Sequence, residues 1–404
     1  MWEVEDVHRY TTGGLHPIRI GDVLSSSRES SPQQYRILNK LGHGSFATVW
    51  LAEMLNAPSR QYVALKVCAA DADPCHETDI LRRIPEIEET RNVLRLRDSF
   101  SVEGPNGIHT VLVHDVLGNI LDLILLDPDG QYAKQMSSMC RQVACGLAAL
   151  HRRGIVHGDI HIMNVGIALP TLEKHPLEDI KGFFGRPDCT VIRSQEHPTE
   201  RPESLPPYLV SSISPVHYMM KMDAVFRETF LQLQIMDLGN AIICDEQERP
   251  YCTPINGCAP ELVFQKIVNS ESVRPSPTKE CDIWSFACLI YRLVFSSSLF
   301  YLCGYNDVML HSMAMICGEV PLEWKDYWDS NEFLSQKNIS QETADAEWQL
   351  RREHVVKCTR KHSEAEVDQI ISLLRSMLKL DPKQRPSIEE VLQHEWFKSS
   401  LALA

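Results

Sequence analysis

The chain has 404 residues, of which 44% are hydrophobic and 23% are charged. A sequence this long and this apolar can bury enough surface to offset the entropy lost on ordering, which excludes disorder throughout the chain. Its 54 Asp and Glu residues outnumber its 40 Lys and Arg residues, and the resulting net charge of −14 argues against a general nucleic-acid binder.

The sequence also argues against secretion and membrane insertion. The first ten residues contain acids where a secretion signal needs a cationic region. The most apolar stretch, Phe286 to Cys303, is interrupted by Arg292 and three serines, so we expect a buried helix there. The 13 cysteines include no Cys-x-x-Cys pair, which predicts reduced thiols rather than a zinc or redox site. We therefore expect a soluble monomer of the cytoplasm and nucleus.

The first part of the chain predicts a small, sheet-rich lobe over residues 34–117. Polar and turn-forming residues dominate residues 1–33, which we expect to form an N-terminal extension. Apolar residues alternate between Tyr35 and Val67 on both sides of a glycine-containing turn, and this pattern predicts three strands. A helix is predicted from Cys75 to Ile84, and a further strand over residues 109–117.

The remainder predicts a larger, mainly helical lobe over residues 118–404. Apolar residues recur at helical spacing from Ala133 to Arg153, and helical patterns dominate after Thr278. Between these regions, residues 168 to about 232 are rich in proline and lack periodicity, which predicts an irregular insertion. Strands early and helices late are typical of an α+β protein with two lobes.

The first chemical motif is a pair of glycines, Gly42 and Gly44, in a turn between two predicted strands. Backbone without a Cβ can approach phosphate oxygens closely and offer its N–H groups, although the same pair is also typical of a simple tight hairpin. The next strand ends in Val-Ala-Leu-Lys66. A glycine-rich hairpin followed by such a lysine is the arrangement that holds the α- and β-phosphates of ATP.

The second motif, His157-Gly-Asp-Ile-His-Ile-Met-Asn164, places Asp159 and Asn164 five residues apart on one loop. The carboxylate can accept a hydroxyl proton while the amide oxygen binds a hard cation such as Mg²⁺. A turn capped by an aspartate and an asparagine is the alternative. The third motif is Asp237-Leu-Gly, which is either an ordinary turn or a second Mg²⁺ ligand.

Three further short motifs follow along the chain. They are Cys258-Ala-Pro-Glu261, Cys281-Asp282-Ile-Trp-Ser285 and Leu380-Asp-Pro-Lys-Gln-Arg385. This order resembles the protein kinase family over residues 34 to 398. The lead-in from Tyr10 to Asp22 and the string Asp-Leu-Gly-Asn-Ala at 237–241 are similar to the SR-protein kinases, particularly the fungal type. The resemblance implies an α+β, bilobal protein kinase fold, with a small antiparallel-sheet N-lobe and a larger, mainly helical C-lobe. It also implies that Asp282 braces the loop of Asp159 and that Glu261 pairs with Arg385.

The resemblance also implies roles for individual residues, with ATP and Mg²⁺ as cofactors. Lys66 would hold the α- and β-phosphates and pair with Glu77, Asp159 would be the catalytic base, and Asn164 and Asp237 would bind Mg²⁺. His161 stands where such kinases carry a catalytic lysine. The residues expected around the nucleotide are Leu41, Gly42, Gly44, Ser45, Val49, Ala64, Lys66 and Glu77, with Asp115 and Leu117 in the hinge.

Three positions depart from the family pattern. Gly158 replaces an arginine that grips a phosphorylated activation loop, so we expect activity without loop phosphorylation. His161 supplies no full charge when neutral, which predicts a slow enzyme. Gly166 lacks the apolar side chain that normally lies under the adenine, which predicts weak ATP binding.

These observations leave three functions open. The preferred one is a protein serine/threonine kinase that phosphorylates Arg-Ser-rich, splicing-factor-like proteins, with no membrane or direct nucleic-acid partner. The acidic net charge permits a basic substrate. The alternatives are a non-catalytic pseudokinase scaffold and, because His157 to His161 also resembles the loop of aminoglycoside and choline phosphotransferases, a small-molecule phosphotransferase.

Overall fold

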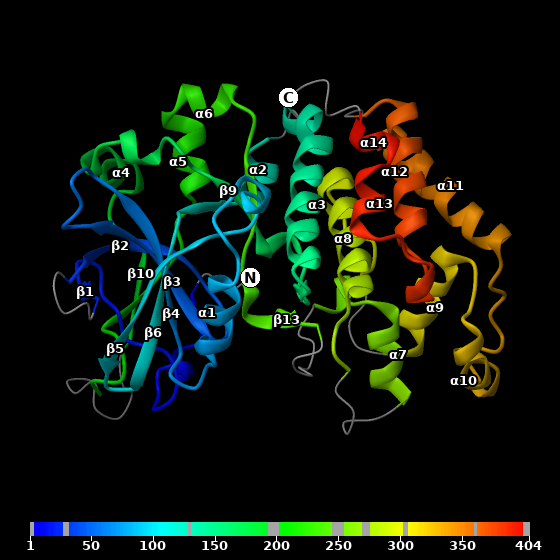
Figure 1. Cartoon of the computed structure of the whole chain (residues 1–404), viewed down its shortest axis with the longest axis horizontal. Coiled ribbons are helices and arrows are strands. Elements are labelled where there is room, and N and C mark those ends of the chain that lie inside the picture. Colours follow the sequence, from blue (N-terminus) through cyan, green and yellow to red (C-terminus); the bar gives the residue numbers. More distant parts are fainter. Residues whose placement is uncertain are drawn as a thin grey trace. The chain divides into compact units, whose positions relative to one another are not determined.

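The computed structural model of the chain describes residues 4–26, 32–127, 131–192, 202–244, 254–268, 275–301, 306–358 and 362–398 (Figure 1). The chain folds as two units. We call the first the sheet unit; it comprises Met1–Glu86, Leu94–Leu123 and Gly166–Leu231. We call the second the helical unit; it comprises Ile87–Val93, Ile124–Val165 and Gln232–Ala404.

The sheet unit is built on a six-stranded antiparallel sheet with the order β1-β2-β3-β4-β6-β5. Its strands are β1 (Val23–Ser25), β2 (Gln34–His43), β3 (Ala47–Met54), β4 (Tyr62–Cys68), β5 (Leu96–Gly104) and β6 (Gly107–His114). The three strands predicted between Tyr35 and Val67 are confirmed as β2, β3 and β4. The predicted helix is confirmed as α1 (Pro74–Arg82), and the strand predicted over 109–117 ends at His114 and resumes as β7 (Leu117–Asn119).

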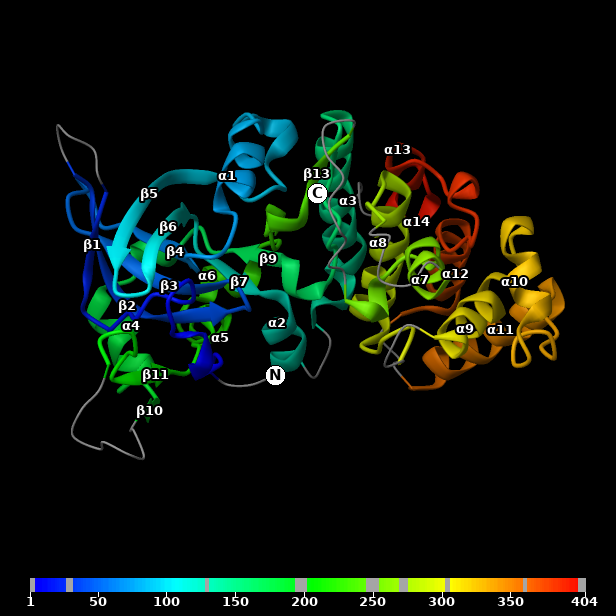
Figure 2. The ribbon, with the colours of Figure 1, turned by 90° about the horizontal axis from the view of Figure 1, so that it is seen from below.

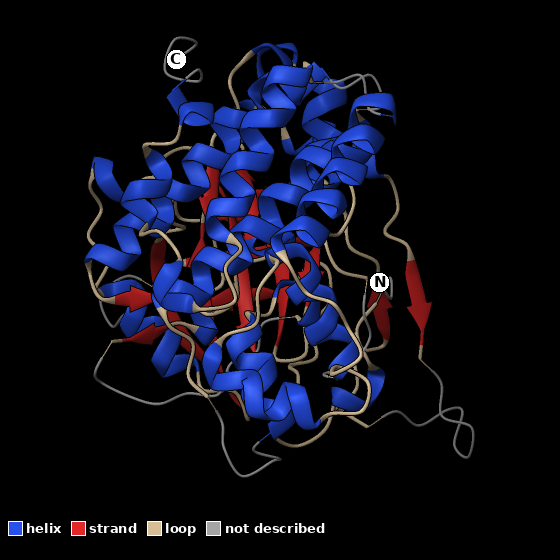
Figure 3. Ribbon diagram, turned by 90° about the vertical axis from the view of Figure 1, so that its right-hand side faces the viewer, coloured by secondary structure: helices blue, strands red, loops and turns tan. Residues whose placement is uncertain are grey.

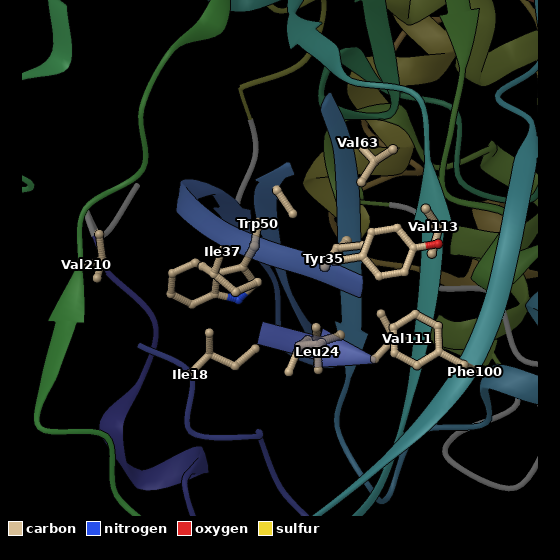
Figure 4. Packing of buried hydrophobic residues seen from close by; sticks show 13 residues of the cluster. Ile18, Leu24, Tyr35, Ile37, Trp50, Val63, Phe100, Val111, Val113 and Val210 are labelled. Atoms are coloured by element: carbon tan, nitrogen blue, oxygen red, sulfur yellow. The ribbon is translucent and has the colours of Figure 1, made fainter. Parts of the chain in front are cut away.

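The core of this sheet draws on segments that are far apart in the sequence (Figure 4). Tyr35 of β2 stacks on Phe100 of β5, with ring centroids 5.6 Å apart. Ile18 from the N-terminal residues and Val210 from the segment after β9 join the same cluster. The N-terminal residues are therefore part of this core rather than a loose extension.

The segment at 168–232 differs from the irregular insertion that the sequence predicts. Its described residues form α4 (Leu177–Phe184), α5 (Pro215–Met222), α6 (Ala224–Glu228) and a two-stranded antiparallel ribbon of β10 (Cys189–Val191) and β11 (Tyr208–Val210). The unit division places Gly166–Leu231 with the N-terminal sheet, whereas the sequence assigned it to the helical lobe. Figure 2 shows α4 and α5 beside β2 and β3.

The hydrogen bonds of one buried asparagine and one close steric contact explain why this segment belongs to the sheet unit. The buried side chain of Asn106, in the turn between β5 and β6, donates hydrogen bonds to the carbonyl oxygens of Leu15 (2.7 Å) and Ser204 (2.9 Å). At Gly118 in β7 a Cβ would collide with the side chain of Val216 on α5. The segment is thus held against the sheet both at a turn and at β7.

The helical unit contains most of the described helices, which Figure 3 draws in blue. They are α3 (Met136–Arg152), α7 (Pro260–Val268), α8 (Lys279–Phe295), α9 (Asp307–Cys317), α10 (Lys325–Ser330), α11 (Gln341–Cys358), α12 (Glu364–Met377), α13 (Ile388–Leu392) and α14 (Glu395–Lys398). The unit also contains β8 (Ile155–Val156), β12 (Leu233–Ile235) and β13 (Ile242–Ile243), of which β8 and β13 pair antiparallel. The short strand β9 (Val165–Ala168) and helix α2 (Ile120–Leu126) lie where the chain passes between units.

Helix α8 confirms the buried helix that the apolar stretch at Phe286 predicts. Nearly all of its side chains are buried, including Trp284 and Phe286. Within the described ranges, no helix combines the length and apolarity that a bilayer crossing requires. Arg385 pairs with Glu261 at 2.6 Å, which confirms the predicted pairing of these two residues.

Candidate active site

Strand β4 and helix α1 bring Lys66 and Glu77 together in the sheet unit. Lys66 Nζ donates hydrogen bonds to both carboxylate oxygens of Glu77, at 2.9 and 2.7 Å, and the two side chains are largely buried. Only a short connection separates the end of β4 from the start of α1, so eleven residues along the chain are enough to place the carboxylate beside the ammonium. The predicted pairing is confirmed.

The glycine-containing turn connects β2 and β3 and runs directly beside Lys66. In the sheet register Gly42 lies opposite Val49, and Val49 lies opposite Lys66 on the next strand. Leu51 lies opposite Ala64 in the same ladder. Leu41 and Val49 are half-buried, Ser45 is exposed, and a Cβ built at Gly42 or Gly44 would meet open space. The turn therefore leaves room for a phosphate close to its backbone.

The residues predicted to form the hinge directly follow β6. Burial lowers the pKa of His114, and its Nδ1 donates a hydrogen bond to the Arg95 carbonyl oxygen at 2.8 Å, so this histidine is a neutral, satisfied core residue. The Asp115 carboxylate pairs with Arg97 at 2.5 Å. This ion pair fixes the side chain of Asp115, and an adenine would be expected to meet the backbone groups of the hinge.

The absence of a side chain at Gly166 has a structural reason. A Cβ at this position would lie 2.6 Å from Cδ1 and 2.7 Å from Cβ of Leu117. In the register of the paired strands β7 and β9, Leu117 lies opposite Ala168, two residues from Gly166. The side chain of Leu117 therefore occupies the space that a side chain at position 166 would need. The weak ATP binding expected from Gly166 stays a prediction.

In the helical unit, Asp282 of α8 fixes the loop that carries Asp159. Its carboxylate accepts hydrogen bonds from the backbone N–H groups of His157 (2.8 Å) and Gly158 (2.9 Å). His151 Nε2 contacts the same carboxylate at 2.9 Å. The predicted bracing of this loop by Asp282 is confirmed. His157 is fully buried, as expected for a core residue.

Asp159 is nine-tenths buried, and its carboxylate is surrounded by polar side chains. Oδ2 accepts hydrogen bonds from Asn164 Nδ2 at 3.2 Å and from Asn240 Nδ2 at 3.1 Å. His161 Nε2 lies 3.4 Å from Oδ1. Oδ2 is thus held in place, whereas Oδ1 is a buried atom without a described hydrogen bond. A carboxylate oxygen in this state keeps the capacity to accept a proton.

Asn240 is a site residue that the sequence analysis missed. It stands in the Asp-Leu-Gly-Asn-Ala string, which was used to recognise the family but was not given a side-chain role beyond Asp237. Its amide reaches Asp159 across 81 positions of sequence. The motif itself was the available signal, because an asparagine three residues after a metal-binding aspartate can turn back toward the same loop.

Asn164 and Asp237 fit the donor set of a magnesium site. The hydrogen bonds described for the Asn164 side chain use its amide nitrogen, which leaves the oxygen for a cation. The Met236 N–H bonds to the Asn164 carbonyl at 2.9 Å, so Asp237 follows directly beside the loop. Asp237 adopts a left-handed backbone (φ 63°, ψ 76°), a strained conformation that clusters at functional sites. Two protein oxygens suffice for Mg²⁺, which takes its other ligands from phosphates and water.

Gly158 also has a backbone reason to be glycine. Its φ is +73°, and a Cβ there would lie 2.9 Å from the Asn240 carbonyl oxygen and 3.0 Å from Pro277 Cγ. An arginine at this position would be strained and would displace the residues that hold Asp159.

The site residues thus form two groups, one in each unit. Lys66, Glu77 and the glycine turn belong to the sheet unit, and Asp159, His161, Asn164, Asn240 and Asp237 belong to the helical unit. A lysine–glutamate pair on an antiparallel sheet, and an aspartate–asparagine loop followed by a strained aspartate, are the defining features of a protein kinase.

Comparisons with known proteins agree with this assignment. The model described as "Protein kinase domain" matches residues 212–397, and "Protein tyrosine and serine/threonine kinase" matches residues 35–172. The chain belongs to the protein kinase superfamily.

Within that superfamily, the chain is similar to SR-protein kinases. It is 27% identical to the serine/threonine-protein kinase SRPK of Physarum polycephalum over 98% of this chain and 91% of the relative. It is 34% identical to the serine/threonine-protein kinase spk-1 of Caenorhabditis elegans over 41% of this chain. It is 33% identical to SRSF protein kinase 3 of Homo sapiens over 40% of this chain and 29% of the relative. The aligned residues span only 15% and 17% of the length of the two Caenorhabditis relatives.

Proposed function

We propose that this protein is an ATP- and Mg²⁺-dependent serine/threonine kinase that phosphorylates serines in Arg-Ser-rich proteins. The observation that carries the proposal is the setting of Asp159. One of its carboxylate oxygens is held by Asn164 and Asn240, and its backbone loop is held by Asp282. A carboxylate that is fixed through one oxygen, and whose other oxygen has no described hydrogen bond, is suited to accept the proton of an attacking hydroxyl.

In this mechanism the residues of the chain position groups and move one proton. Lys66, kept in place by Glu77, binds the α- and β-phosphates, and the backbone of the glycine turn covers them. Asn164 and Asp237 supply oxygen ligands, and bound Mg²⁺ would screen the phosphate charge. Asp159 takes the proton of the serine hydroxyl. As it does so, the serine oxygen bonds to the γ-phosphorus and the bond between the γ-phosphorus and the departing ADP breaks.

The choice of Arg-Ser-rich substrates rests on similarity and charge. Relatives of this chain carry the names SRPK and SRSF protein kinase 3. The net charge of −14 favours a basic polypeptide over an acidic one. An acidic protein also accelerates encounter with arginine-rich segments, and this effect weakens as salt is added.

The test is transfer of radiolabelled phosphate from ATP to an Arg-Ser repeat peptide. We expect labelling by the parent protein and loss of labelling in Asp159→Ala. A Lys-Ser peptide of equal charge tests specificity, because lysine lacks the planar fork of arginine. Equal labelling by the parent and by Asp159→Ala would contradict the assigned base, and equal labelling of the two peptides would contradict the substrate class.

Two further assays separate the alternative functions. Labelling of choline or an aminoglycoside, but of no peptide, would identify a small-molecule phosphotransferase. A thermal shift with Mg-ATP that is accompanied by no transfer to any acceptor would identify a pseudokinase scaffold.

A further inference from the structure

A strip of backbone at residues 69–71 connects the N-terminal residues to the glycine turn. On one side, the N–H groups of Ala70 and Asp71 donate to the carbonyl oxygens of Gly14 (3.0 Å) and Gly13 (2.6 Å). On the other side, the Ala69 N–H donates to the carbonyl oxygen of Phe46 (2.8 Å), which lies at the tip of the glycine turn. Residues 69–71 are therefore hydrogen-bonded both to the N-terminal residues and to the turn that would cover the phosphates.

Arg9 adds a side-chain contact across the same strip. Its two terminal guanidinium nitrogens pair with the two oxygens of Asp71, at 3.2 and 2.9 Å. Its guanidinium carbon also lies 5.9 Å from the centre of the Phe46 ring, within the range of a cation–π interaction. Phe46 is 63% exposed, which is unusual for a large aromatic side chain. Arg9 thus touches the only large apolar group at the tip of the turn.

The N-terminal residues that carry Arg9 are fixed by a buried ion pair. Glu5 pairs with Lys40, and both side chains are almost completely buried. The Tyr10 hydroxyl donates to Glu5 Oε1 at 2.5 Å, and the Leu15 N–H donates to the Arg9 carbonyl at 2.7 Å. The backbone of Arg9 is therefore held from both directions, and its side chain extends from a rigid base toward Phe46.

We propose that Arg9 is a positioning residue for the nucleotide-binding turn, acting through Phe46 and Asp71. By holding the tip of the turn, Arg9 lowers the entropy that the turn loses when it closes over a triphosphate. The proposal rests on the proposed function, in which this turn covers ATP. Arg9 itself contacts no reacting atom, so it should affect binding of ATP more than the chemical step.

The first experiment needs no catalysis. Amide hydrogen exchange of residues 42–47 is measured in the protein without nucleotide, for the parent, Arg9→Ala and Arg9→Lys. We expect faster exchange of this peptide in Arg9→Ala, and an intermediate rate in Arg9→Lys, because lysine keeps the charge but loses the planar fork. The matched control is Arg36→Ala on β2, which removes an exposed arginine paired with Glu53 at 3.7 Å in the same sheet.

The second experiment measures steady-state kinetics with ATP. A cation–π contact and a partly exposed ion pair are both weak interactions, so we expect Arg9→Ala to raise KM for ATP roughly three- to tenfold. The value of kcat should change by less than about twofold, since the variant removes an interaction outside the reacting centre. Asp71→Asn should reproduce part of the effect, and the double variant should show less than the sum of the two.

The outcomes distinguish the two proposals. Unchanged exchange of residues 42–47 in Arg9→Ala would overturn the role of Arg9, whether or not the protein is active. Faster exchange in Arg9→Ala, with no phosphate transfer by the parent, would support the positioning contact and contradict the kinase function. A loss confined to kcat, or an equal effect of Arg36→Ala, would also overturn the proposal.

Discussion

The residue at position 161 determines how much positive charge the chain places beside Asp159, the proposed catalytic base. His161 Nε2 lies 3.4 Å from Asp159 Oδ1 and 3.2 Å from the amide nitrogen of Asn164. A neutral imidazole at this point offers one hydrogen bond, whereas the lysine common in this family offers a full charge. A phosphoryl group held beside His161 would therefore meet a weaker electrostatic partner than it would beside a lysine.

The His161→Lys variant tests this interpretation. We expect a phosphate-transfer rate roughly three- to tenfold above the parent, because a charged donor binds phosphate oxygens more strongly than a neutral one. The matched control, His161→Gln, keeps a neutral donor and should stay close to the parent. A rate for His161→Lys that equals or falls below the parent rate would contradict this explanation.

A second residue-scale feature is the buried histidine pair of the sheet unit. The rings of His16 and His109 lie 4.7 Å apart. Burial, with a smaller contribution from His109, lowers the pKa of His16 to about 4. Burial also lowers the pKa of His109. Both rings are thus neutral at pH 7 in the folded protein, and protonating either one favours the unfolded chain.

This pair predicts a loss of stability in mild acid. A histidine whose pKa is lower in the folded state stabilises the fold above its unfolded pKa of about 6.5, and this stability is lost as the pH falls toward 4. For His16 alone, we expect the free energy of unfolding to fall by at most about 2 kcal/mol between pH 7.5 and pH 5. Urea unfolding at the two pH values measures the change. The drop should shrink in His16→Asn, and an equal drop in both proteins would contradict the assignment.

At the scale of elements, the N-terminal segment is the feature that the sequence described least well. Its ion pair between Glu5 and Lys40 is almost completely buried, and the Lys40 ammonium also lies 5.2 Å from the centre of the Trp50 ring. Burial lowers the pKa of Lys40, while the charge of Glu5 opposes this shift. The segment therefore supplies the counter-charge for a lysine inside the sheet unit.

Glu5→Gln is expected to destabilise the sheet unit by about 3 kcal/mol, because it leaves a buried ammonium without its counter-charge. The double variant Glu5→Gln/Lys40→Met should recover most of that loss, since an apolar pair of similar volume avoids the desolvation of both charges. Chemical denaturation of the three proteins gives the comparison. If Glu5→Gln is as stable as the parent, the ion pair does not support the fold.

How much of the fold could be predicted depended on how many buried residues each element contains. The strands β2, β3 and β4 and the helices α3 and α8 have long apolar patterns, and the sequence predicts them. Strand β5 was missed because only Phe100 is fully buried along it. The helices α4, α5 and α6 have five to eight residues each, and their apolar partners lie far away in the sequence, so no local pattern identifies them.

The site shows the same limit. Motif order identifies Lys66, Asp159, Asn164 and Asp237, because each motif is read from adjacent residues. The contact of Asn240 with Asp159, and that of Arg9 with Phe46, depend on chain folding over long sequence distances. The close approach of Leu117 to Gly166 likewise depends on the pairing of two strands that are far apart in the sequence. Contacts of this kind become visible only in three dimensions.

At the scale of the whole molecule, the chain predicts a kinase that does not depend on phosphorylation of its own activation segment. Gly158 cannot be replaced by the arginine that would bind a loop phosphate, because its φ is +73° and its Cβ position is blocked by Asn240 and Pro277. The Asp159 loop is held instead by the carboxylate of Asp282. This bracing needs no modification.

Phosphatase treatment of the purified protein tests that expectation. We expect transfer to the Arg-Ser peptide to stay within about twofold of the untreated protein, since no charged partner for a loop phosphate stands at position 158. Mass spectrometry establishes that phosphate has been removed. Loss of activity that returns after rephosphorylation would show that the molecule uses another phosphate-binding residue.

The central claim is that Asp159 performs the chemical step while ATP is held by other residues. The measurement that tests it most directly combines the ATP dissociation constant with the single-turnover transfer rate in Asp159→Asn. We predict an ATP dissociation constant within about twofold of the parent and a transfer rate lower by roughly 10²–10⁴-fold, the usual contribution of a general base. Transfer at the parent rate in Asp159→Asn would contradict the account.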